Sequence, residues 1–109
     1  MTTIYIAGPM SGLPNFNYPA FNAAEKRLLA AGFHTSNPTV TTAFEKRMPP
    51  PSEQGRIYSW YLRAGLHRLI TCDAVALLPG WEKSTGANLE VHVARKLGLT
   101  IQPLESWLE

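Results

Sequence analysis

The chain has 109 residues, of which 45% are hydrophobic and 17% are charged, with a formal net charge of +2. This composition is that of one ordinary globular domain, over residues 1–109, and its scattered basic residues argue against a nucleic-acid polymer as partner. No apolar run approaches the roughly 18 residues of a membrane span. The single cysteine, Cys72, excludes an internal disulfide and a CxxC metal motif. We therefore expect a cytoplasmic protein without a signal peptide.

The first third of the chain predicts a strand, a helix and a weaker strand. Thr3 to Ala7 alternates β-branched and aromatic residues, as strands do, and is followed by a loop with two glycines and a hydroxyl group. As a phosphate-binding signal this loop is weak by itself, and an ordinary strand-to-helix turn explains it equally well. A helix is expected from Pro19 to about Ala31, then a strand from Phe33 to Asn37. The predicted buried positions of the helix are Phe21, Ala24, Leu28 and Ala31.

The middle of the chain combines a long connection with a helix. Thr39 to Gly55 includes three consecutive prolines, and a connection of this length is usually a lid, an oligomer contact or a disordered segment. Ile57 to Leu69 is predicted to be helical, with Ile57, Tyr61 and Ala64 on one side. Gly65 lies in the middle of this helix, where glycine costs about 1 kcal/mol relative to alanine, and nothing in the sequence compensates for it.

The last third predicts strand, helix and strand. Ala74 to Leu78 reads as a buried strand, and Leu99 to Gln102 as a further strand, followed by a tail that packs back or meets another subunit. Between them, Ser84 or Thr85 caps a helix that ends at Gly98. The alternation of elements indicates a doubly wound, parallel α/β sheet of the flavodoxin or Rossmann type, with about four strands in the order 2-1-3-4. In that order Gly8, Asn37 and Pro79 follow strands at one edge of the sheet, whereas Asp73 lies at the opposite edge and is interpreted as structural.

Glu90 is the residue that the pattern does not explain as structural. It falls within the apolar stripe formed by Ala87, Val91 and Ala94, and it has no basic residue three or four positions away. One interpretation is a carboxylate that reaches solvent from the edge of the stripe. The helix follows directly on a strand, however, and open α/β sheets bind ligands where their strands end. We therefore favour a functional carboxylate.

Two stretches, IYIAGPMSG and CDAVALLPGWEKSTGANLE, followed by a helix ending in ARKLGL, resemble a phage and prophage family placed with the nucleoside 2-deoxyribosyltransferases and the deoxynucleoside monophosphate N-glycosidases. The resemblance to the phage family covers nearly the whole chain, and that to the characterised enzymes covers the two end motifs. It implies an α/β domain in the cytoplasm of a bacterial host, assembled at least as a dimer, that binds a small-molecule nucleotide without a cofactor or a metal.

The resemblance also implies roles for single residues. Glu90 takes the place of the nucleophile that attacks C1′ of the deoxyribose, and Tyr5 that of the residue that orients it. Ser84 stands where a serine favours a 5′-phosphate. The other substrate-binding positions expected are Gly8, Pro9, Met10, Ser11, Gly12, Trp81 and Gly86; for Trp81, stacking on a base and ordinary packing are equal alternatives.

One position departs from the enzymes. They carry an acidic residue eight positions before the aspartate that precedes the strand, and in this chain that place is Gly65. His67 and Glu82 are the neighbouring candidates for a proton donor. Three functions therefore compete: an N-glycosidase or deoxyribosyltransferase, a nucleotide-binding module without turnover, and a phage interaction protein that keeps the fold for its surface. Fold alone does not choose among them.

Overall fold

The computed structural model describes residues 2–39 and 56–109, with side chains from residue 60 onward in the second range. Four strands form a parallel sheet in the order β2-β1-β3-β4, which confirms the predicted α/β fold and strand order. The strands are β1 (Thr3–Ala7), β2 (His34–Ser36), β3 (Ala74–Leu77) and β4 (Thr100–Pro103).

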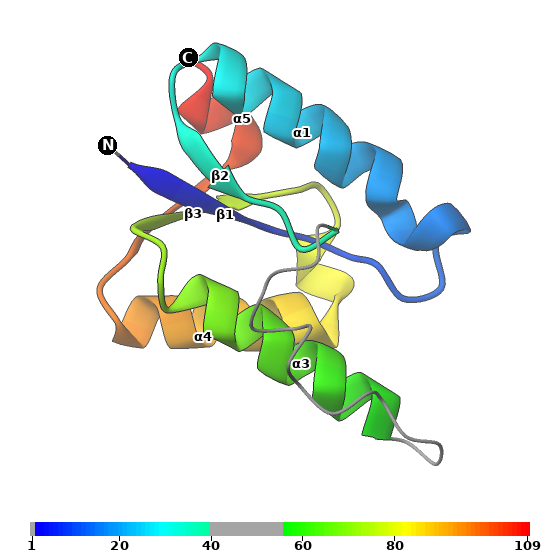
Figure 1. Cartoon of the computed structure of the whole chain (residues 1–109). Helices are drawn as coiled ribbons and strands as arrows, with labels where there is room; N and C mark the ends of the chain where they lie inside the picture. Colours follow the sequence, from blue (N-terminus) through cyan, green and yellow to red (C-terminus); the bar gives the residue numbers. More distant parts are fainter. Residues whose placement is uncertain (1, 40–55) are drawn as a thin grey trace.

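Helices cover both faces of this sheet (Figure 1). On one face lie α1 (Tyr18–Ala30) and the short α5 (Leu104–Trp107); on the other lie α3 (Arg56–Leu69) and α4 (Thr85–Lys96). Two 3-10 helices, η1 (Pro14–Asn17) and η2 (Trp81–Lys83), precede α1 and α4. None of the helices described is long and apolar enough to cross a membrane. The predicted connection Thr39–Gly55 falls, beyond its first residue, outside the described part of the chain.

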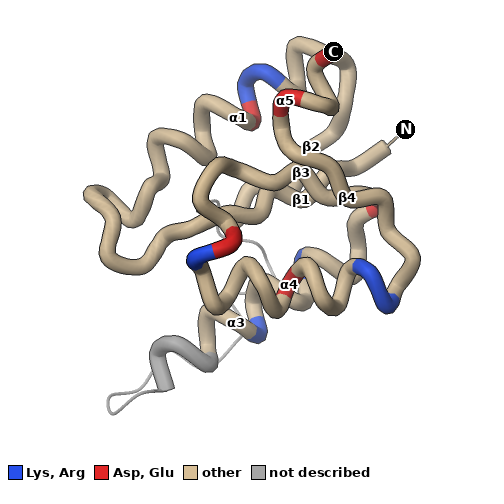
Figure 2. Tube along the Cα trace, turned by 180° about the vertical axis from the view of Figure 1, so that it is seen from behind, with Lys and Arg blue, Asp and Glu red and all other residues tan. Residues whose placement is uncertain are grey.

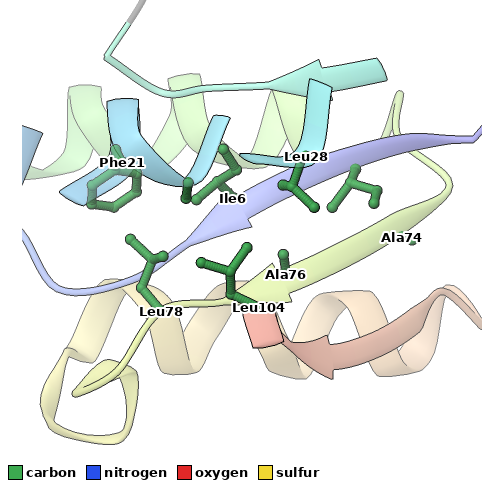
Figure 3. Close-up of a cluster of buried hydrophobic side chains, with 9 residues drawn as sticks. Ile6, Phe21, Leu28, Ala74, Ala76, Leu78 and Leu104 are labelled. Carbon is green, nitrogen blue, oxygen red and sulfur yellow. The ribbon is translucent and has the colours of Figure 1, made fainter. Parts of the chain in front are cut away.

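Alternation along β1 divides the interior into two clusters. Ile4 and Ile6 point toward α1 and α5, where Phe21, Leu28 and Leu104 pack over them (Figure 3). Tyr5 and Ala7 point to the other face, toward α3 and α4. The remaining members of that second cluster are Leu69, Cys72, Val75, Leu77, Val91 and Ala94. Because side chains alternate along a strand, Tyr5 reaches the α3–α4 side without disturbing the apolar packing on the α1 side.

Several predicted details are confirmed. Ser84 is the N-cap of α4, its hydroxyl accepting the N–H of Ala87 at 3.1 Å, and Gly98 has the left-handed backbone (φ 75°) expected after the helix. Asp73 is structural, because its carboxylate accepts the N–H of Thr3 at 2.9 Å at the opposite edge of the sheet. The tail packs back, since the indole of Trp107 donates to the backbone oxygen of Val75 at 3.0 Å.

One predicted buried position was wrong. Ala31 follows the last residue of α1 and is exposed, because the chain leaves the helix there before a full turn can bring it back to the sheet. Tyr61, predicted on the same side of α3 as Ala64, is exposed (57%), whereas Ala64 and Leu69 are buried. Its ring lies edge-on to Trp60, at 5.0 Å between ring centroids. The segment predicted as an irregular loop before α1 contains η1, where three successive residues, Asn15 to Asn17, have left-handed backbone.

Candidate functional site

The hydroxyl of Tyr5 donates a hydrogen bond to the carboxylate of Glu90, at the place where the sheet meets α3 and α4. Tyr5 comes from the middle of β1 and is buried, and Glu90 comes from the second turn of α4. The bond joins residues 85 positions apart in the sequence. Ala87, Val91 and Ala94, the predicted stripe, are buried and hold α4 against the sheet. Glu90 is therefore turned inward with them.

Gly65 makes room for this pair. A methyl group at this position would lie 2.6 Å from Oε2 of Glu90 and 3.2 Å from the Tyr5 hydroxyl oxygen. A side-chain Cβ essentially never makes a non-bonded contact shorter than 3.0 Å, so α3 packs this closely against the carboxylate because residue 65 has no side chain. The glycine that the sequence left unexplained has a tertiary reason: it lets the α3 backbone contact Glu90.

Burial changes the acidity of both groups. It raises the pKa of Glu90 from 4.5 to about 7, and the hydrogen bond from Tyr5 opposes this rise by favouring the carboxylate. Burial and the nearby carboxylate together raise the pKa of Tyr5 well above its ordinary value of 10.0. Tyr5 therefore remains a protonated donor, whereas Glu90 changes its charge near neutral pH. Perturbed carboxylates of this kind are typical of functional sites.

The loop that enters α4 carries Trp81 and Ser84 and is held by a residue that sequence reasoning missed. The side-chain amide of Asn88 donates to the backbone oxygens of Glu82 at 2.9 Å and Ser84 at 2.8 Å, with a longer contact of 3.4 Å to Trp81. Asn88 thereby ties η2 to the first turn of the helix. A possible signal in the sequence was an asparagine four residues after the helix cap, where its amide can turn back to the loop.

The predicted binding residues fall into two loops. Gly8 packs on Leu78, so that a methyl group there would lie 2.7 Å from the leucine Cβ. The lack of a side chain at Gly8 therefore serves packing within the protein. Pro9 accepts a hydrogen bond from Asn17 at 3.0 Å, and a methyl group on Gly80 would contact the Pro9 ring at 3.5 Å. The loops after β1 and β3 are therefore neighbours at the carboxyl edge of the sheet.

The other predicted residues differ in exposure. Met10 is partly buried against the first cluster, whereas Ser11 and Gly12 are exposed. Trp81 is partly buried against the second cluster, so the packing alternative holds for part of its ring. Gly86 lies in the first turn of α4 and is partly buried.

In the part of the chain that the structure describes, the charged residues outside this pair form no second cluster of metal ligands. Basic and acidic residues are scattered along the described chain (Figure 2). Within that part of the chain, no three His, Cys, Asp or Glu side chains come together as metal ligands. The surface ion pair between Arg27 and Glu105, at 2.7 Å, joins α1 to α5 on the opposite face of the sheet. The Tyr5–Glu90 pair is the candidate site.

Comparison with known proteins gives a family without assigned chemistry. The chain matches no curated protein. A family model matches residues 2–102, which is most of the chain. The protein therefore belongs to the family described as a domain of unknown function, DUF4406.

Proposed function

We propose that this protein cleaves the N-glycosidic bond of a 2′-deoxynucleoside 5′-monophosphate, by hydrolysis or by transfer to another base. Glu90 is the nucleophile that forms a covalent glycosyl intermediate, and Tyr5 orients it. The observation that carries the proposal is the hydrogen bond from Tyr5 to the inward-facing Glu90 carboxylate. A carboxylate held in one orientation beside the carboxyl edge of a parallel sheet suits attack on an anomeric carbon.

The reactive oxygen follows from the contacts. Oε2 accepts the Tyr5 hydroxyl and lies against Gly65, and no hydrogen bond to Oε1 is found among the described residues. Oε1 is therefore the oxygen assigned to attack C1′. As a carboxylate, Glu90 also stabilises the positive charge that develops on the sugar in an oxocarbenium-like transition state.

The start of α4 supports binding of the 5′-phosphate. The first N–H groups of a helix lack partners within the helix and attract anions. The Ser84 hydroxyl accepts the N–H of Ala87 and still has its own proton to donate, because a hydroxyl both accepts and donates. In this proposal Ser84 and the amides of Thr85 and Gly86 bind the phosphate, with Ser11 as a second contact.

Base release tests the proposal. Each deoxynucleoside monophosphate is incubated with the protein at pH 6 and pH 8, with and without an acceptor base, and free base is measured by chromatography. Glu90→Ala and Glu90→Gln should abolish release, and Tyr5→Phe should reduce it. Glu109→Gln, which changes an exposed carboxylate with no role in the site, is the matched control and should retain activity. Release that survives in both Glu90 variants would refute the nucleophile.

Gly65 favours a second candidate, a nucleotide-binding module without turnover. The resemblance places an acidic residue here, and this chain has α3 backbone in contact with Glu90 instead. In that case a deoxynucleotide raises the melting temperature in a Ser84-dependent way, while no base is released by any variant. We also propose that the protein assembles at least as a dimer, which sedimentation equilibrium measures directly.

A further inference from the structure

The position of one proton bears on which substrate this site can cleave. A tyrosine hydroxyl carries a single proton, and in Tyr5 that proton is directed to Oε2 of Glu90. Burial and the neighbouring carboxylate keep Tyr5 in its protonated form, because both raise its pKa. The phenol proton is thus engaged at the nucleophile. It does not point toward a leaving base on the far side of the anomeric carbon.

With Glu90 and Tyr5 in these positions, α3 has no room for an acidic side chain at residue 65. At Gly65 a methyl group would lie 2.6 Å from Oε2, 3.2 Å from the Tyr5 oxygen and 3.7 Å from the Glu90 carboxyl carbon. The Glu90 carboxylate and the Tyr5 hydroxyl therefore occupy the space in which a side chain from residue 65 would begin. Glu90, Tyr5 and the α3 backbone fill this side of the site together.

We infer that the substrate is an N-glycoside whose base already carries a positive charge, such as an N7-alkylated purine or a pyridinium nucleotide. This inference rests on the proposed function and specifies its leaving group. A neutral base departs with an extra electron pair and needs a proton from an acid. A cationic base needs none, because the electron pair of the broken bond neutralises it.

The steps balance without a proton donor. Oε1 of Glu90 forms a bond to C1′ while the C1′–N bond breaks, and its electron pair passes to the ring nitrogen, so that the base leaves uncharged. Water then attacks C1′, the ester electron pair returns to the Glu90 carboxylate, and the proton of the water is released to solvent. The ionised carboxylate is also electrostatically suited to a cationic substrate.

A matched pair of substrates tests the inference. N7-methyl-2′-deoxyguanosine 5′-monophosphate and 2′-deoxyguanosine 5′-monophosphate differ by one methyl group and one charge, and nicotinamide mononucleotide provides a pyridinium. Release of base is measured by chromatography with the wild-type protein, with Glu90→Gln and Glu90→Ala, and without protein to subtract spontaneous loss. Melting curves verify that each variant is folded.

The expected result is Glu90-dependent release, with kcat/KM for at least one cationic substrate exceeding that for 2′-deoxyguanosine 5′-monophosphate by about 100-fold or more, the smallest usual contribution of general acid catalysis. With nicotinamide mononucleotide, whose pyridinium charge does not depend on pH, the rate should rise with pH to a plateau, without a fall on the alkaline side. A smaller ratio would show that an acid assists departure and would overturn the inference while leaving the proposed function intact. Absence of Glu90-dependent release from all three substrates and from the neutral panel would refute both.

Discussion

Replacing Glu90 by glutamine should stabilise the protein, and increasingly so as the pH rises. In the unfolded chain the carboxyl group loses its proton near its ordinary pKa of 4.5, whereas in the folded protein it keeps the proton up to about pH 7. Between these values the folded state binds more protons, so the free energy of unfolding falls as the pH rises and levels off above about pH 7. At about 1.4 kcal/mol per pKa unit, the carboxylate costs about 3 kcal/mol at pH 8.

Glutamine removes that cost and still accepts the Tyr5 hydroxyl through its amide oxygen. Urea unfolding of wild-type protein and Glu90→Gln, measured from pH 4 to pH 8, should therefore give similar stabilities at pH 4 and a difference of about 3 kcal/mol at pH 8. Tyr5→Phe should shift the fall in stability to higher pH, because loss of the hydrogen bond that favours the carboxylate raises the pKa of Glu90 further. Glu82→Gln controls for the change of one charge. If the free energies of unfolding of the wild-type protein and Glu90→Gln differ by the same amount at every pH, the reasoning is refuted.

Three further substitutions test the surroundings of the pair. Gly65→Ala should destabilise the wild-type protein despite the better helix propensity of alanine, because the new methyl group meets Oε2 of Glu90. In the Glu90→Ala variant that contact is absent, so the same substitution should stabilise the protein by up to about 1 kcal/mol. An equal destabilisation of both proteins in urea unfolding would contradict the packing argument. Ser84→Ala removes the cap bond to Ala87 and should cost about 1 kcal/mol in the same assay, and Ser84→Thr should recover most of it. Asn88→Ala removes the bonds that hold the preceding loop, so hydrogen exchange should speed up at the amides of that loop and not in the sheet; unchanged exchange there would show that the loop is held by other contacts.

The strand order and the inward direction of Glu90 were predictable because each rests on local regularity. Apolar runs separated by amphipathic helices predict a parallel sheet, and a stripe at helical spacing predicts which side of α4 is buried. The resemblance then paired Glu90 with Tyr5, and the structure has a hydrogen bond between them. The error at Ala31 lies where spacing alone does not fix the residue at which a helix stops.

What the sequence determined by itself is the type and order of the elements, since helix caps, glycine stops and apolar periodicity act between residues a few positions apart. Only the tertiary structure decided the environment of the carboxylate. The pKa of Glu90 depends on desolvation by elements distant in the sequence, and the reason for glycine at position 65 depends on a contact between α3 and α4. Both effects require distances between side chains that meet only when the sheet has assembled, and no local pattern encodes such distances.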